Sequence, residues 1–347
     1  MSRLGAEPKP TWQQVPRAVR RETERALGAP VRRALRVWGG YAPSATFRLF
    51  LADGRRAIFK GVHAGSTDYL RTVLRNEERV YRELGPFISP WAPAFYGALR
   101  LANWHALLLE DVGRARVPPW TERQVRLALR DYAAFHASTL GRRDLPGWLS
   151  RRQHHGFGLT WQRLQSAAQP GGVDSLASLA GPRSGEALAW LNHHLPRLRT
   201  AAEGLARVGA PYALLHFDTR SDNLRLSGGG RLRLFDWPYA CLGPPEFDVA
   251  AFVQSIAAEG GPEPERSINW YAESIRVREA AIDASIAALA GYFAWQAWQP
   301  PLPGLPRLRW VQRQQLRSSL AWCSRRLGLP EPEWVAWVGN SSTGPTR

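Results

Sequence analysis

The chain has 347 residues, a formal net charge of +17 and a hydrophobic content of 44%. This length exceeds one ordinary core, so the composition predicts two lobes around a sizeable apolar interior. The only two cysteines, Cys241 and Cys323, exclude a disulfide framework and a cysteine-ligated metal. The low number of cysteines fits a reducing compartment, and the N-terminus lacks an apolar signal core. These two features together predict a cytoplasmic location. No apolar run reaches the roughly 18 residues that cross a membrane, so no membrane partner is expected.

The positive charge raises the question of a nucleic-acid partner. All but two of the 46 basic residues are arginines, which indicates a preference throughout the chain rather than one designed patch. Residues 241–347 hold ten acidic and ten basic residues, so the excess lies in residues 1–240. No aromatic and basic binding motif accompanies it, and nucleic acid is not favoured as the main partner.

The first third of the chain reads as a strand-rich segment. Asp53-Gly54 separates two alternating apolar runs, which predicts an antiparallel hairpin over residues 46–62. Apolar residues then recur at helical spacing from Tyr69 to Leu84, and Gly85-Pro86 is expected to end that helix. Two further strands are expected over residues 98–101 and 105–109.

Helical patterns dominate the rest of the chain, at residues 121–140, 185–208, 267–298 and 308–327. Short apolar runs at 213–216 and 232–235 lie on either side of a polar cluster. We therefore expect an N-lobe over residues 1–111, a C-lobe over 112–338 and a disordered tail over 339–347.

The polar cluster is His216-Phe-Asp-Thr-Arg-Ser-Asp-Asn223, which matches the kinase catalytic-loop spacing. Asp236 follows thirteen residues after Asn223, at the end of an apolar run. Carboxylate and amide oxygens are hard ligands, so Asn223 and Asp236 are the predicted Mg²⁺ ligands. Asp218 is the predicted catalytic residue, which accepts the proton of an acceptor hydroxyl. Arg220 and Asp222, between the two, are expected to face the acceptor.

Lys60 ends the second strand of the hairpin, where a kinase holds the α- and β-phosphates. Only one other lysine occurs, and a compact ammonium suits this position better than a forked guanidinium. Its expected partner is Glu77, three residues before the apolar Val80 on the following helix. Glu78 is then expected to face solvent.

Taken together, these motifs resemble those of the aminoglycoside phosphotransferase and choline-kinase-like family, of the protein-kinase-like superfamily. The resemblance covers residues 30–300 approximately, and it rests on Ala57–Lys60, Asn76-Glu77, Leu107–Gly113, Phe135–Ala137, Leu215–Asp218 with Asn223, Phe235–Trp237 and Gly243–Ala250. Asp-Trp at 236–237, where protein kinases have Asp-Phe-Gly, favours the small-molecule branch. Phe217 and Asp222 depart from the family pattern, as does the phosphate loop at 39–46.

This resemblance implies a bilobal α+β fold, with a small antiparallel-sheet N-lobe and a large, mainly helical C-lobe. It implies ATP or GTP and Mg²⁺ as cofactors, with Glu110 and Val112 in the hinge that offers backbone groups to the base. Asp248 would brace the catalytic loop. The implied activity is transfer of the γ-phosphate to a hydroxyl of a small molecule.

Two alternatives remain within this fold. A nucleotide-binding pseudokinase or regulatory protein would bind without turnover, although Lys60, Asp218, Asn223 and Asp236 are all present. A protein kinase is disfavoured by Asp236-Trp-Pro and by the lack of a following Ala-Pro-Glu segment. The identity of the acceptor is open, but the balanced charge of residues 241–347 does not favour a polycation.

Overall fold

The computed structural model describes residues 9–37, 44–63, 65–114, 117–166, 171–227, 230–302, 305 and 307–339. The chain divides into two compact units. The first consists of Met1–Val117, His216–Ala240 and Pro303–Pro306, and the second of Pro118–Leu215, Cys241–Leu302 and Arg307–Arg347. The segment that carries the catalytic-loop motif therefore belongs to the first unit, together with the N-terminal strands.

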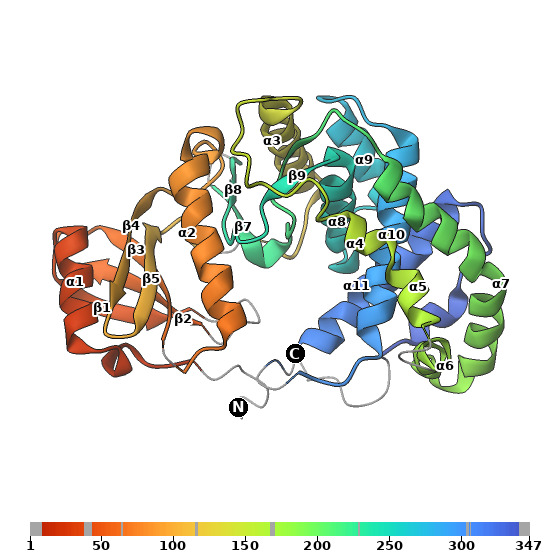
Figure 1. Ribbon diagram of the computed structural model, residues 1–347, viewed down its shortest axis with the longest axis horizontal. Helices are drawn as coiled ribbons and strands as arrows, with labels where there is room; N and C mark the ends of the chain where they lie inside the picture. The colour runs from red at the N-terminus through yellow and green to blue at the C-terminus, as the bar shows by residue number, and fades with distance from the viewer. Residues whose placement is uncertain are drawn as a thin grey trace. The chain divides into compact units, whose positions relative to one another are not determined.

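A five-stranded antiparallel sheet of order β1-β2-β3-β5-β4 is the framework of the first unit (Figure 1). Its strands are β1 (Val31–Arg36), β2 (Ala45–Leu51), β3 (Arg56–Val62), β4 (Phe95–Leu101) and β5 (Trp104–Glu110). The predicted hairpin is confirmed, since β2 and β3 pair with Leu49 opposite Ala57. Gly54 takes a φ of +85° in the turn, a conformation that glycine adopts without strain.

The sequence reading missed strand β1. It reads Val-Arg-Arg-Ala-Leu-Arg and pairs with β2 at the edge of the sheet. None of its residues is buried, so no apolar alternation marks it as a strand. Its place is determined by pairing with β2 rather than by its own pattern.

Alternation along the strands separates two faces of this sheet. Phe47, Leu49 and Phe59 point into a core that includes residues of α1 (Arg17–Leu27) and is joined by Trp12 of η1 (Trp12–Gln14). Lys60 follows Phe59 in β3 and so lies on the other face, which α2 (Asp68–Ile88) contacts. The period of two in β3 therefore directs the lysine toward the helix.

Helix α2 is longer than expected, and the prediction that Gly85-Pro86 ends it was wrong. The helix continues through Pro86 to Ile88, and Ser89 N–H donates to Gly85 O at 3.0 Å. Pro86 removes only one backbone donor near the helix end, and Ile88 is almost fully buried. Burial of the last turn offsets the missing hydrogen bond.

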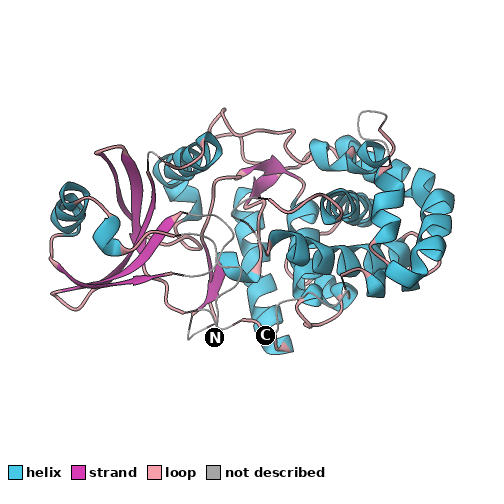
Figure 2. Cartoon of the chain, turned by 90° about the horizontal axis from the view of Figure 1, so that it is seen from below, coloured by secondary structure: helices cyan, strands magenta, loops and turns pink. Residues whose placement is uncertain are grey.

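The second unit is mainly helical (Figure 2). Its longer helices are α3 (Glu122–Thr139), α7 (Ser184–Glu203), α8 (Pro245–Ala258), α9 (Pro264–Ala272), α10 (Glu279–Ala297) and α11 (Leu308–Arg326). The short helical segments are α4 (His155–Gly158), α5 (Thr160–Leu164), α6 (Gly172–Ser178), η2 (Gly181–Arg183), η3 (Gly204–Arg207) and η5 (Glu333–Trp337).

The single helix expected over residues 267–298 is in fact two helices, α9 and α10. Arg278 lies between them and binds Glu246, which is only 2% exposed. The guanidinium Nε and Nη2 atoms lie 2.9 and 2.8 Å from the carboxylate, and the Arg278 backbone N–H also donates to it at 3.1 Å. This buried partner fixes the break, and it comes from a distant segment that periodicity does not report.

Two small antiparallel ladders complete the fold. One pairs β6 (Ala213–Leu215) with β9 (Cys241–Gly243) in the second unit, and the other pairs β7 (Leu224–Leu226) with β8 (Leu232–Leu234) in the first. Of the predicted tail, residues 340–347 lie outside the described part of the chain. The expected α+β class is confirmed. None of the helices in the described ranges has both the length and the apolar character to cross a membrane.

Candidate active site

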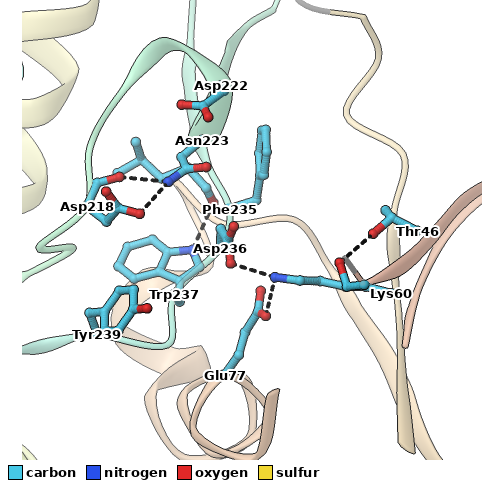
Figure 3. Close-up of polar contacts among 12 residues, drawn as sticks. Thr46, Lys60, Glu77, Asp218, Asp222, Asn223, Phe235, Asp236, Trp237 and Tyr239 are labelled. Atoms are coloured by element: carbon cyan, nitrogen blue, oxygen red, sulfur yellow. Dashed lines mark hydrogen bonds and ion pairs between the residues drawn. The ribbon is translucent and has the colours of Figure 1, made fainter. Parts of the chain in front are cut away.

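Lys60 stands at the centre of a three-residue cluster in the first unit. Its Nζ atom lies 2.5 Å from Glu77 Oε2 and 2.5 Å from Asp236 Oδ1 (Figure 3). The three side chains come from β3, from α2 and from the residues that follow β8. The predicted Lys60–Glu77 pair is therefore present, and the pairing with Asp236 adds a contact that links β3 to the segment after the catalytic loop.

The electrostatics of this cluster follow from burial and close charges. Burial alone would lower the pKa of Lys60, but the Asp236 and Glu77 carboxylates outweigh it and raise that pKa. Burial raises the pKa of Glu77 against the opposing effect of Lys60. At Asp236 the nearby ammonium overcomes burial, so the pKa of that carboxyl is lowered. Lys60 is thus held as a cation, and Asp236 as an anion.

Glu78 does not face solvent as expected. It is 6% exposed, and its carboxylate binds Arg82 on α2, Arg100 on β4 and His105 on β5 at 2.7–2.8 Å. The sheet residues that hold it lie more than twenty positions away in sequence, so helix spacing could not reveal them. Lys60 and Glu78 lie in separate ion clusters, and Glu77 remains the partner of Lys60.

The catalytic-loop motif brings Asp218 and Asn223 together. Asn223 Nδ2 donates to Asp218 Oδ2 at 2.9 Å and to the Asp218 carbonyl oxygen at 2.9 Å. Arg220 Nε lies 3.2 Å from Asp218 Oδ1, and Arg220 Nη2 lies 3.2 Å from Asp222 Oδ2. Desolvation raises the pKa of Asp218 to about 7, Arg220 opposes the rise, and the Asp222 and Asp236 carboxylates add to it. An aspartate tuned to this range can accept a proton near neutral pH.

The two predicted metal ligands occupy adjoining positions. The Phe235 N–H donates to the Asn223 carbonyl oxygen at 3.0 Å, which places Asp236 one residue from that contact. Among the described residues, both side-chain hydrogen bonds of Asn223 come from its nitrogen, so its amide oxygen is left for a cation. Asp236 uses one carboxylate oxygen for Lys60 and keeps a second. The donor set therefore fits Mg²⁺, which binds few protein oxygens and keeps water or phosphate ligands.

Two residues of this segment have left-handed backbone conformations. Phe217 has a φ of +71° and Asp236 a φ of +69°. For a bulky residue this costs on the order of 1–2 kcal/mol, and such residues gather where structure serves function. His216 contributes to holding the segment, because its Nε2 lies 3.1 Å from the Phe235 carbonyl oxygen and its ring packs on Trp237.

The predicted hinge residues lie at the end of β5 and just after it. The Glu110 N–H donates to Ala94 O at 2.9 Å, so that donor is already used. In the described part of the chain, the backbone of Val112 makes no hydrogen bond. Its N–H therefore fits the requirement for a donor to a nucleotide base. Most of the predicted phosphate loop, residues 39–43, lies outside the described ranges, and Thr46 pairs with Lys60 across β2 and β3.

Asp248 belongs to α8, in the second unit. It is fully buried and accepts a hydrogen bond from the Tyr132 hydroxyl at 2.7 Å.

Sequence reading missed two contacts close to the site. The Leu234 N–H donates to Trp91 O at 2.6 Å, and the hydroxyls of Tyr69 and Tyr239 bind each other. Neither contact has a sequence signal, because each joins α2 or the α2–β4 connection to residues near Asp236.

Comparison with known proteins gives the family. The model of the phosphotransferase enzyme family matches residues 33–269. The chain belongs to the phosphotransferase enzyme family. This confirms the predicted resemblance, and it makes the protein a phosphotransferase. No curated protein matches the chain.

Solved structures with a similar fold include two phosphotransferases and a kinase. A spectinomycin phosphotransferase in complex with ADP and spectinomycin has a TM-score of 0.55 at 14% identity, over 87% of this chain and 97% of its own. An aminoglycoside phosphotransferase from Alicyclobacillus acidocaldarius has a TM-score of 0.51 at 14% identity, over 86% and 93%. A choline kinase from Streptococcus pneumoniae has a TM-score of 0.50 at 13% identity, over 86% and 98%. These similarities confirm the protein-kinase-like fold.

Proposed function

We propose that this phosphotransferase moves the γ-phosphoryl group of ATP or GTP onto a hydroxyl of a small molecule. The observation that carries the proposal is the Lys60 ammonium held between Glu77 and Asp236, beside a loop that presents Asp218 and Asn223. In the reaction, the acceptor oxygen forms a bond to the γ-phosphorus and the bond to the β–γ bridging oxygen breaks. A nucleoside diphosphate leaves, and the hydroxyl proton passes to Asp218.

Asp218 has the chemistry that the acceptor side requires. One of its carboxylate oxygens is held by Asn223 and the other lies near Arg220, so its orientation is fixed before a substrate arrives. A pKa of about 7 lets a useful fraction of the carboxylate accept a proton near neutral pH. We assign Asp218 as the catalytic base on these grounds.

Lys60 and Val112 have the chemistry that the nucleotide side requires. The ammonium of Lys60 supplies a compact charge for the α- and β-phosphates, and Glu77 holds it in place. Val112, with Glu110 before it, supplies backbone groups for the base. Asn223 and Asp236 would hold Mg²⁺, which neutralises charge on the phosphates when it is bound.

The acceptor is proposed to be a small hydroxylated molecule rather than a polycation, because residues 241–347 carry equal numbers of acidic and basic residues. Two proteins with a similar fold are a spectinomycin phosphotransferase and a choline kinase, so this fold accommodates acceptors of different chemistry. We further propose that the protein acts in the cytoplasm.

The test is a screen of small hydroxylated compounds with ATP·Mg²⁺ and with GTP·Mg²⁺. Mass spectrometry should find a product heavier by about 80 Da, one phosphoryl group. The Asp218→Asn variant is the control, because it keeps the size of the side chain and removes the base. Nucleotide binding with no phosphorylated product across a broad screen would favour the alternative, a pseudokinase or regulatory protein.

A further inference from the structure

Arg48, on β2 of the first unit, lies on the face of the sheet that carries Lys60. It is opposite Ile58 of β3, and cross-strand partners point to the same face of a sheet. Thr46, two residues earlier on β2, is opposite Lys60. Because side chains alternate along a strand, Arg48 and Lys60 share a face. Arg48 is therefore on the side of the sheet where we place the nucleotide phosphates.

The guanidinium of Arg48 holds both neighbours of Val112. Its Nε atom lies 2.8 Å from Asp111 Oδ2, and its Nη2 atom donates to Gly113 O at 2.8 Å. In the order of the sheet, β3 separates β2 from β5, so this side chain crosses a strand to reach the residues that follow β5. Adjacent strands are about 4.8 Å apart, and only a long side chain spans two such steps. One forked cation thus binds the residues on both sides of Val112.

The carboxylate of Asp111 is the anchor of this arrangement. Its side chain is only 1% exposed, and a buried carboxylate needs charged or hydrogen-bonding partners. Arg56 also approaches it, but its Nε lies 3.4 Å from Oδ2 and its side chain is 53% exposed, against 17% for Arg48. The other carboxylate oxygen, Oδ1, accepts the Gly113 N–H at 3.0 Å, which closes a turn around Val112. Arg48 is the closer and less exposed of the two cations, so it contributes more to holding Asp111.

Val112 therefore lies between residues that are held in place. Before it, the Glu110 N–H donates to Ala94 O at 2.9 Å, and the Glu110 carboxylate accepts the Ala94 N–H at 3.0 Å. After it, both backbone groups of Gly113 are bonded. The backbone of Val112 itself makes no hydrogen bond within the described ranges. A donor whose neighbours are already fixed loses little backbone freedom when a base binds to it.

We propose that Arg48 is a positioning residue for the nucleotide base: by binding Asp111 and Gly113, it fixes the backbone of Val112 for the base. This inference rests on the proposed function, since it takes Val112 as the base contact. Loss of Arg48 should weaken the part of the nucleotide affinity that comes from the base and leave the part that comes from the phosphates. A residue that only stabilised the fold would affect both parts alike.

Titrations with ATP·Mg²⁺ and with tripolyphosphate·Mg²⁺ separate the two parts, because tripolyphosphate has the phosphates and no base. Arg48→Ala should raise the Kd of ATP·Mg²⁺ about tenfold, as expected for the loss of about one hydrogen bond. The Kd of tripolyphosphate·Mg²⁺ should change by less than about twofold, because the phosphates are proposed to bind Lys60. Adenosine, which has the base and no phosphates, is the reciprocal probe: Arg48→Ala should weaken its binding and Lys60→Ala should not. GTP and guanosine replace ATP and adenosine if the wild type prefers GTP.

Arg56→Ala is the matched control, because it removes a more exposed arginine beside the same carboxylate. It should change the Kd of ATP·Mg²⁺ by less than about twofold, since exposed ion pairs contribute little. Arg48→Lys covers the case in which Arg48→Ala does not fold. A lysine keeps the charge beside Asp111 but lacks the fork that also reaches Gly113, so ATP·Mg²⁺ should bind about threefold more weakly, with tripolyphosphate·Mg²⁺ unchanged.

Two results would overturn the inference while the proposed function stands. One is wild-type affinity for the nucleotide in a folded Arg48 variant, and the other is an equal loss of affinity for nucleotide and tripolyphosphate in that variant. A nucleotide affinity that falls as far in Arg56→Ala as in Arg48→Ala would also contradict the role assigned to Arg48. If the wild type binds neither ATP nor GTP, the proposed function fails, and this inference fails with it.

Discussion

Lys60 is one of only two lysines in a chain that otherwise uses arginine, and its surroundings explain the choice. The ammonium fits between two carboxylates at 2.5 Å each, and the side chain is 16% exposed. A planar guanidinium is larger and directs its donors as a fork. Lys60→Arg should therefore lower kcat/KM on the order of 10²-fold, nearly as much as Lys60→Ala, because positioning and charge dominate phosphoryl transfer. Steady-state kinetics of both variants measure this, and a fully active Lys60→Arg would exclude a close-fitting ammonium site.

Glu77 and Glu78 are neighbours with separate partners, so they should respond differently to the same substitution. Glu77→Gln weakens the hold on Lys60 and should lower kcat/KM with a smaller change in stability. Glu78→Gln should lower the free energy of unfolding by about 2 kcal/mol, because it disrupts charge-assisted bonds to Arg82 and Arg100. Kinetics and denaturant unfolding of the two variants make the comparison, and the reverse pattern would show that the roles are exchanged.

The contribution of Glu78 to stability should depend on pH in a defined direction. Although burial acts against it, hydrogen bonds from Arg100, Arg82 and His105 lower the pKa of Glu78 to about 2. A carboxyl whose pKa is lower in the folded state than in the unfolded state stabilises the protein fully at any pH above its unfolded-state pKa. For Glu78 the unfolded-state pKa is about 4.5, so its stabilising contribution is lost as the pH falls from there toward 2. The difference in unfolding free energy between wild type and Glu78→Gln should thus be constant from pH 7 to 5 and shrink below that. A difference that grows in acid would contradict this assignment.

Substitution of Asp218 should affect turnover and leave nucleotide binding nearly intact, since we propose that Asp218 serves the acceptor side of the reaction. Asp218→Asn keeps an oxygen near Arg220 but cannot accept the proton. We expect turnover to fall to background and the Kd of the nucleotide to change by less than about twofold. Single-turnover kinetics and nucleotide titration measure the two quantities. Normal turnover in this variant would remove Asp218 from the mechanism.

At the scale of elements, the sequence predicted those structures whose signals are local. The Asp53-Gly54 turn and the flanking alternation identified β2 and β3, and the period of α2 pointed to Glu77 as partner of Lys60. Strand β1 was not predicted, because an edge strand with no buried residue shows no alternation of apolar and polar residues. Likewise, the burial of Glu78 could not be predicted, because its partners Arg100 and His105 lie on β4 and β5. No local sequence pattern connects these strands to α2.

The break between α9 and α10 shows how a single buried ion pair can define an element. Arg278→Ala leaves Glu246 buried without its guanidinium partner, which should cost about 3 kcal/mol. Arg276→Ala is the control, because Arg276 is exposed and makes no ion pair among the described residues. Denaturant unfolding should separate the two variants clearly. Equal stability of the two variants would mean that this ion pair does not hold the break between α9 and α10.

At the scale of the whole molecule, the compact units are not continuous stretches of the sequence. Composition changes near residue 112 suggested lobes that are continuous in sequence, whereas the first compact unit also contains His216–Ala240. Lys60 and Glu77 belong to Met1–Val117, and Asp218, Asn223 and Asp236 belong to His216–Ala240. Each group could be recognised from its motif. The direct contact between Lys60 and Asp236 joins residues that are 176 positions apart in the chain. No sequence pattern reports such a contact, so only the structure reveals it.

This arrangement predicts where nucleotide binding should stabilise the protein. A ligand that binds only the folded state stabilises it by about 2.7 kcal/mol at a hundredfold excess over its Kd. Because every residue proposed for the nucleotide and the metal lies in the first unit, ATP·Mg²⁺ should slow amide exchange mainly in residues 44–113 and 216–240. Removing Mg²⁺ with a chelator should weaken this protection, and Asp236→Ala should make protection insensitive to the chelator. Hydrogen exchange read by mass spectrometry measures each peptide separately. Protection confined to residues 118–215, or equal protection by ATP with and without Mg²⁺ in the wild type, would contradict the proposed nucleotide and metal ligands.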